Sequence, residues 1–235
     1  ERLNDEFFSK YKEHYERFVE YVTGKRFVKD KGKLIEKTTG KPCPEHKTVF
    51  NGDDKLGRNF VKLLLGRLVF IQFLQKKGWM GVPATNTKWT GGEPDFLLNL
   101  FKDCKNPEKF HSASLFPLFY SAFNTPNRTN DIFKLTGTRI PYLNGGLFEN
   151  EYPDSEKINF PKEYFEKLLE FFGHYNFTID ENDPDDHEVG IDPEMLGHIF
   201  ENLLEDNKDK GAFYTPKAIV QYMCQESLIQ YLKTY

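Results

Sequence analysis

Apolar side chains recur at three- and four-residue steps near the start of the chain, which is the spacing of one face of an α-helix. These positions are Phe7, Phe8, Tyr11, Tyr15, Phe18, Val19 and Val22. Charged residues fill the opposite side, so the pattern predicts an amphipathic helix. Asn4 or Asp5 can cap its beginning, and Gly24 can end it.

The strongest core signal lies in residues 54–78. Apolar residues there cover nearly every face, which is typical of a helix at the centre of a domain. Gly78 can close its last turn. Arg67 interrupts the apolar run. A snorkelling or paired side chain is the plainer interpretation of this arginine, and a phosphate contact is the alternative.

Further helices are predicted over 95–105, 112–124 and 161–173. Pro117 lies near the start of the second of these, where proline is tolerated. The basic range 25–53 is rich in Gly, Pro and Thr, so it predicts a long excursion that can include a short hairpin.

The connections between these helices read as loops and turns. Ranges 81–94 and 124–139 are predicted to be irregular, and 175–179 predicts a short strand. The Asn-Gly-Gly of 144–146 tolerates positive φ and fits a tight turn before an apolar anchor at Phe148.

Two helices joined by a short elbow are predicted at the far end. The first covers 192–204, with Asp192 as cap and an apolar face of Met195, Ile199, Leu203 and Leu204. The elbow is 211–216 (Gly-Ala-Phe-Tyr-Thr-Pro), where Thr215 can cap the last helix and Pro216 can begin it. That helix carries a stripe predicted to be buried, formed by Ile219, Val220, Met223, Ser227, Leu228 and Tyr231.

The elbow leaves backbone N–H groups at a helix N-terminus, which favours an anion such as a carboxylate, and it offers two aromatic rings for stacking. A plain capped helix start is the simpler interpretation. Both remain open from the residues alone.

The segment 195–204 (Met-Leu-Gly-His-Ile-Phe-Glu-Asn-Leu-Leu), followed by 210–216 (Lys-Gly-Ala-Phe-Tyr-Thr-Pro), resembles the start of adenine-N6 DNA methyltransferases. The similar enzymes are those of type I and fused type II restriction–modification systems. Segments 66–70 (Gly-Arg-Leu-Val-Phe), 77–80 (Lys-Gly-Trp-Met) and 143–148 (Leu-Asn-Gly-Gly-Leu-Phe) also resemble the helical region before the methyltransferase in fused enzymes.

This resemblance implies a cofactor and a site. In that family the Phe-Tyr-Thr-Pro element touches the methionine end of S-adenosylmethionine. It therefore implies that Phe213, Tyr214 and Thr215 contact this cofactor and that Gly211 and Pro216 shape the elbow. The family's glycine-rich strand and its Asn-Pro-Pro-Tyr-type tetrapeptide should follow, yet the 235 residues contain neither. We therefore expect the front part of a larger enzyme, inactive by itself.

Charge is unevenly distributed along the chain. The net charge is −4, but 25–47 has a local balance of +5 and 180–206 a balance of −11. The basic stretch suits weak contact with phosphate, whereas a solvated face is the plainer alternative. The candidate DNA-contacting residues are Lys25, Arg26, Lys29, Lys31 and Lys33.

Cysteine usage indicates a reducing compartment. Cys43, Cys104 and Cys224 are too scattered for a disulfide framework. No secretory signal and no membrane-spanning run stand out, so we expect a cytoplasmic protein. Cys43 and His46 have ligand spacing, but no second pair follows, and we therefore predict no metal site.

These patterns together predict a mainly α fold. Residues 1–181 are expected to form a multi-helix domain with long loops, and 182–235 the helical lead-in to a Rossmann-like methyltransferase domain. The expected partners are double-stranded DNA and the remaining methyltransferase and specificity regions. The alternative is a non-enzymatic helical adaptor that binds DNA or protein and spaces other catalytic domains.

Overall fold

The computed structural model describes residues 2–30, 33–143, 145–177, 190–191, 197 and 217–233. This part of the chain is mainly α, as predicted, with small two-stranded sheets. Its α-helices are α1 (Arg2–Thr23), α2 (His46–Phe50), α3 (Asp54–Lys76), α4 (Phe96–Lys102), α5 (Lys162–Gly173) and α8 (Lys217–Lys233).

Short elements connect these helices. They are η1 (Pro107–Lys109), η2 (His111–Leu115), η3 (Leu118–Phe123), η4 (Thr129–Asp131), η5 (Gly146–Phe148) and η6 (Pro153–Lys157). The strands are β1 (Lys25–Asp30), β2 (Lys33–Thr38), β3 (Ile132–Phe133) and β4 (Thr138–Arg139). Both sheets are antiparallel hairpins.

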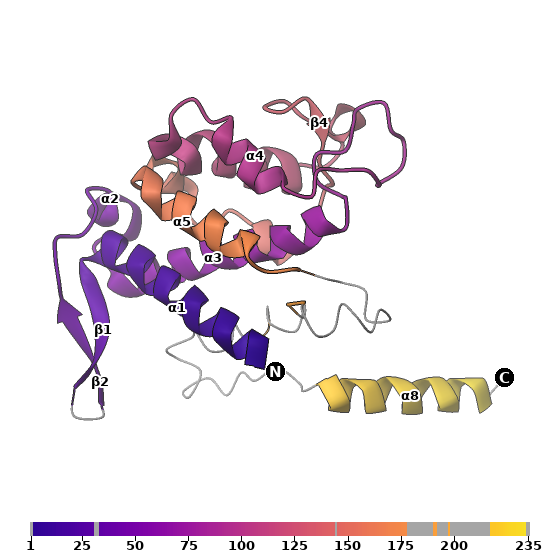
Figure 1. Cartoon of the computed structure of the whole chain (residues 1–235), viewed down its shortest axis with the longest axis horizontal. Helices are drawn as coiled ribbons and strands as arrows, with labels where there is room; N and C mark the ends of the chain where they lie inside the picture. The colour runs from indigo at the N-terminus through magenta and orange to yellow at the C-terminus, as the bar shows by residue number, and fades with distance from the viewer. Residues whose placement is uncertain are drawn as a thin grey trace.

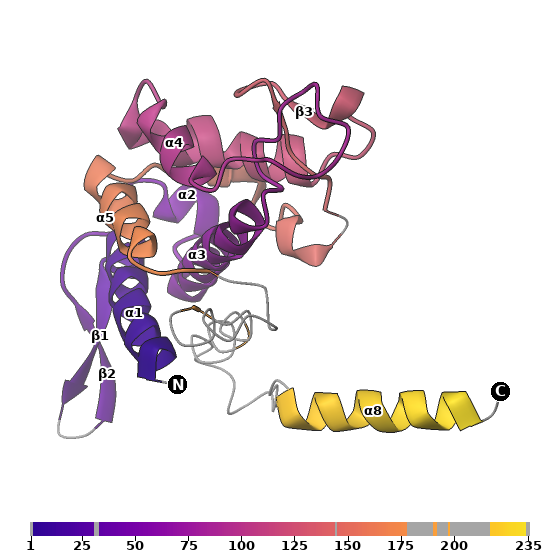
Figure 2. The ribbon, with the colours of Figure 1, turned by 45° about the vertical axis from the view of Figure 1, so that its right-hand side comes forward.

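Helix α3 is the centre of the molecule, with α1 beside it (Figures 1 and 2). Asp53 caps α3, because its carboxylate accepts from the backbone N–H groups of Lys55 at 2.7 Å and Leu56 at 3.3 Å. Side chains on most faces of α3 are buried, which confirms the prediction of a central helix.

Helix α1 ends at Thr23, and Gly24 follows it with a φ of 71°, the left-handed conformation of a helix stop, as predicted. The predicted cap is wrong: Asn4 and Asp5 lie inside α1, which is already helical at Arg2. Apolar periodicity located this helix, but helix ends depend on local hydrogen bonds that the pattern does not contain.

The helical stretch predicted over 112–124 differs in its geometry. Wide π-type turns form η2 and η3, so Phe116 N–H donates to His111 O and Asn124 N–H to Phe119 O. Pro117 lies between these turns, in the middle of the stretch rather than near its start. Proline has no N–H to donate, and a local widening of the helix accommodates that loss.

The abundant aromatic residues pack against one another inside the body. Phe7 stacks on Phe171 with ring centroids 5.1 Å apart, and Phe123 stacks on Phe148 at 4.5 Å. All four rings are buried. These rings therefore form the core rather than a base-stacking surface.

Arg67 is 3% exposed and is held by the segment after the predicted turn. Its guanidinium donates to Leu147 O at 2.7 Å, to Glu149 O at 2.8 Å and to the Tyr120 hydroxyl at 2.8 Å. The paired interpretation is confirmed and the phosphate contact is wrong. Segment 143–148 is architectural because its backbone accepts from Arg67, with Phe148 as the buried anchor.

At the predicted turn of 144–146, neither glycine has the positive φ that the sequence would tolerate. Gly145 has an extended φ of −162°, and Gly146 is not among the residues with positive φ. Asn144 lies outside the described residues. Phe148 itself confirms the apolar anchor.

Helix α8 lies apart from the body in both views (Figures 1 and 2). The prediction of a buried stripe is wrong here: Ile219, Val220, Met223, Leu228 and Tyr231 are 45–59% exposed, and Ser227 is exposed as well. The spacing correctly predicted a helix. Its apolar stripe would be buried only if another element packed against it, and no described element covers the stripe of α8.

The boundary between residues 181 and 182 stays a prediction. Ile191 is buried in the core of the helical body, and its N–H donates to Asn176 O at 2.6 Å.

Among the described helices, none is long and apolar enough to cross a membrane.

Candidate nucleic-acid interface

The basic excursion forms a β-ribbon. Strands β1 and β2 pair so that Lys25 faces Thr38, Arg26 faces Lys37, Phe27 faces Glu36 and Val28 faces Ile35. The ribbon extends from the body beside α1 and α2 (Figure 1). The hairpin that the sequence allowed within 25–53 is therefore present.

Gly24 connects the ribbon tightly to α1. Its carbonyl accepts from Thr39 N–H at 2.9 Å and Gly40 N–H at 3.1 Å. A Cβ at Gly24 would lie 2.7 Å from Gly40 O. Thr23 supports the same junction because its hydroxyl donates to Val19 O at 2.8 Å. The ribbon thus begins at a fixed angle to α1.

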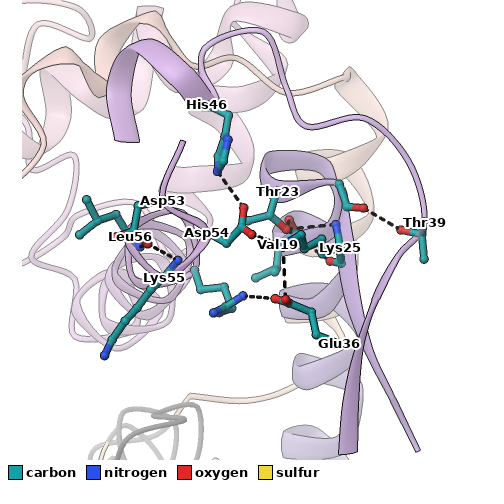
Figure 3. Close-up of polar contacts among 12 residues, drawn as sticks. Val19, Thr23, Lys25, Glu36, Thr39, His46, Asp53, Asp54, Lys55 and Leu56 are labelled. Atoms are coloured by element: carbon teal, nitrogen blue, oxygen red, sulfur yellow. Dashed lines mark hydrogen bonds and ion pairs between the residues drawn. The ribbon is translucent and has the colours of Figure 1, made fainter. Parts of the chain in front are cut away.

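Ion pairs hold one face of the ribbon on α3 (Figure 3). Lys25 Nζ lies 2.5 Å from Asp54 Oδ2 and 3.4 Å from Glu36 Oε2. Arg58 Nη1 lies 2.6 Å from Glu36 Oε1. His46 Nε2 lies 3.1 Å from Asp54 Oδ1, without the geometry of a hydrogen bond.

The predicted basic residues therefore differ in their surroundings. Lys25 is paired with carboxylates of the protein, and these neighbours raise its pKa, with the Asp54 carboxylate as the first cause. Arg26 is exposed on the opposite face. Lys29 and Lys33 lie in β1 and β2, where they face Leu34 and Asp30. Lys31 lies outside the described residues.

Lys37 is a further basic residue of the ribbon, outside the set predicted from the sequence. It lies directly across the ribbon from Arg26, and both side chains are exposed. Alternation along a strand could have identified it, because residues two apart share a face. The pairing partner across the hairpin, however, depends on a turn register that the sequence did not specify.

The elbow at 211–216 is the predicted cofactor site. Gly211, Phe213, Tyr214, Thr215 and Pro216 lie outside the described residues. Most of the helix predicted over 192–204 also lies outside them, apart from Gly197, which is helical.

Cys43 is buried and lies three residues before His46, the first residue of α2. Burial raises the pKa of the Cys43 thiol to about 11, so the sulfur stays protonated at neutral pH and is a poor nucleophile. No cluster of three or more metal-ligating side chains occurs among the described residues.

The described part is therefore a helical domain that carries a basic ribbon. The chain is related to a restriction–modification protein: it is 31% identical over 240 residues to a relative from Methanocaldococcus jannaschii, named "Putative type II restriction enzyme and methyltransferase RM.MjaORFECS2P". The similarity covers 92% of this chain and 19% of the relative. No family model and no solved structure matches the chain.

Proposed function

We propose that this chain is the helical part of a restriction–modification enzyme that methylates N6 of adenine in DNA with S-adenosylmethionine. The similarity to the Methanocaldococcus jannaschii protein, which is named as a restriction enzyme and methyltransferase, carries this proposal. This similarity extends along almost the whole chain. The two terminal motifs at 195–204 and 210–216 support the adenine-N6 class by resemblance.

In this proposal, Phe213, Tyr214 and Thr215 contact the methionine end of the cofactor, while Gly211 and Pro216 shape the elbow. N–H groups at a helix N-terminus attract a carboxylate, which is the charge that the methionine end carries. The cofactor would supply the methyl group. The residues of this chain would bind and orient its carboxylate.

Methyl transfer also needs residues that these 235 do not include. The target adenine must leave the base stack, and a polar tetrapeptide must hold its amine. No Asn-Pro-Pro-aromatic or Asp-Pro-Pro-aromatic sequence occurs in the chain. The 235-residue chain is therefore proposed to be inactive alone and to act together with further methyltransferase and specificity regions on double-stranded DNA.

Two experiments test this proposal. In the first, the chain is incubated with labelled S-adenosylmethionine and mixed-sequence DNA, and no incorporation above background is expected. In the second, the coding sequence downstream is read for a glycine-rich strand followed by the Pro-Pro tetrapeptide. Incorporation by the chain alone would show that the active site has been misplaced.

The basic ribbon favours a second candidate, a non-enzymatic adaptor that binds DNA and spaces other catalytic domains. If downstream sequence contained another catalytic domain and no methyltransferase motif, the adaptor would be the better description.

A further inference from the structure

The ribbon has two faces with different electrostatic roles. Side chains alternate along a strand, and directly paired residues share a face. Lys25, Phe27 and Glu36 therefore lie on the face that contacts α3, where Arg58 also sits 5.3 Å from the Phe27 ring. This inner face is internally neutralised by the ion pairs with Asp54 and Glu36.

The outer face carries two cations directly opposite each other. Arg26 pairs in register with Lys37, and both are exposed. Directly opposed side chains have Cβ atoms about 5 Å apart, and like charges at this distance destabilise a hairpin. Among the described residues, no carboxylate forms an ion pair with either side chain.

Neighbouring groups reduce this repulsion only in part. Glu16 of α1 is close enough to Arg26 for their charges to attract, and it offsets part of that charge without forming an ion pair with it. The residues beside the cationic pair, Val28 and Ile35, are apolar and carry no charge. An external anion would therefore relieve the repulsion between Arg26 and Lys37.

We infer that the outer face of the ribbon contacts the DNA phosphate backbone through Arg26 and Lys37, whereas Lys25 and Arg58 hold the ribbon in place. This inference rests on the proposed function, which supplies DNA as the anion. A ribbon fixed at Gly24 and on α3 presents these cations without further ordering, and phosphate contacts position a protein without reading sequence.

Salt-dependent DNA binding tests the inference. The 235-residue chain and its Arg26→Gln/Lys37→Gln variant are titrated with a mixed-sequence duplex at several salt concentrations. Each lost phosphate contact should lower the slope of log affinity against log salt by about 0.9, so the slope should fall by about 2. The affinity ratio between parent and variant should then shrink by about tenfold between about 50 and 200 mM salt.

A matched control removes the same charge elsewhere. Lys105→Gln/Lys109→Gln replaces two exposed cations next to α4 and should leave the slope unchanged. Lys37→Glu gives a second readout: it should raise the melting temperature by relieving the repulsion, yet weaken DNA binding. A merely structural pair would not separate stability from affinity in this way.

Two outcomes would overturn the inference. One is a slope that the Arg26/Lys37 double variant leaves as steep as in the control. The other is a parent chain that shows no duplex binding even at low salt. Either result leaves methyl transfer by the longer enzyme untouched, because that activity is measured separately from the methylated product.

Discussion

Arg67 donates a 2.8 Å hydrogen bond to the hydroxyl of Tyr120, 53 residues further along the chain. The same guanidinium holds Leu147 O and Glu149 O. It therefore joins α3, η3 and the end of η5 at one buried point. Burial lowers the pKa of Arg67, and the charge is held by neutral acceptors and by the faces of neighbouring rings.

Replacing Arg67 should therefore destabilise the helical body. In Arg67→Lys, a single ammonium cannot span three acceptors arranged for a planar fork, so buried carbonyls lose their donors. We expect a loss of about 3 kcal/mol in the free energy of unfolding. Tyr120→Phe removes one bond to a charged donor and should cost about 2 kcal/mol.

Urea unfolding measures both variants. Arg17→Lys is the control, because Arg17 lies 4.2 Å above the Tyr164 ring at a part-exposed site and should lose less than about 1 kcal/mol. If Arg67→Lys cost no more than this control, the buried cluster would not be the point that joins the three segments.

Gly24→Ala should distort the junction between α1 and the ribbon. Gly24 has a φ of 71°, and a Cβ there would lie 2.7–2.9 Å from backbone atoms of Gly40, Lys41 and Pro42. Gly137 has a φ of 70° but nothing within 4 Å of an added Cβ. Gly137→Ala should therefore cost about 1 kcal/mol, from backbone strain alone, and Gly24→Ala about 3 kcal/mol.

Thermal unfolding of these two alanine variants separates strain from crowding. The difference between them reports the close approach of the two backbone segments. Equal losses would mean that the chain around Gly40 moves aside without cost and that Gly24 does not fix the ribbon.

Acid should weaken the fold through His111. This ring is 2% exposed, its Nδ1 lies 2.8 Å from Ile158 O, and burial lowers its pKa from 6.5 to about 4. Between these pH values the unfolded chain binds a proton that the folded chain does not. The stability is therefore fully present above about pH 6.5 and is lost as the pH falls towards 4.

A pKa difference of this size corresponds to about 3 kcal/mol. Stability measured from pH 7.5 to 4 should therefore fall more steeply for the parent than for His111→Gln, whose amide can still donate to Ile158 O. His174→Gln, at an exposed position, should follow the parent curve. Parallel curves for the parent and His111→Gln would contradict this explanation.

The two long helices could be predicted because the spacing of apolar residues along the chain is enough to locate them. The apolar spacing from Phe7 to Val22 and the all-round apolar run in α3 located the two long central helices. The phosphate alternative for Arg67 was wrong because the protein itself supplies three hydrogen-bond acceptors for the guanidinium. These acceptors lie 53–82 residues away in the sequence. No local pattern encodes contacts of that separation.

The arrangement of the basic residues could not be predicted for a related reason. Composition identified the basic stretch, but it contains neither the ion pair of Lys25 with Asp54 nor the hairpin register that places Lys37 opposite Arg26. Likewise, spacing predicted the helix of α8 but not what covers it. The elbow at 211–216 lies outside the described residues, so its role stays a proposal.

Thr215 distinguishes a helix cap from a cofactor contact. Asp caps a helix as well as Thr does, so Thr215→Asp should keep the melting temperature of the longer enzyme. If the Thr215 hydroxyl meets the methionine carboxylate, Asp would place a like charge there and clearly weaken cofactor binding. Thr215→Ala would lose both roles, with the cap worth about 1 kcal/mol.

Calorimetric titration with S-adenosylmethionine measures the effect. Thr215→Ser is the matched control, because it keeps both the cap and the hydroxyl and should bind the cofactor nearly as the parent does. Unchanged affinity together with unchanged stability in Thr215→Asp would leave Thr215 a helix cap only.

The methylated product tests the central proposal most directly. The longer enzyme is incubated with duplex DNA and S-adenosylmethionine carrying a labelled methyl group, and the DNA is digested to nucleosides and analysed by mass spectrometry. We predict that the label appears in N6-methyladenine. Label in a methylated cytosine, or no labelled nucleoside from a folded enzyme that binds the cofactor, would contradict the proposal.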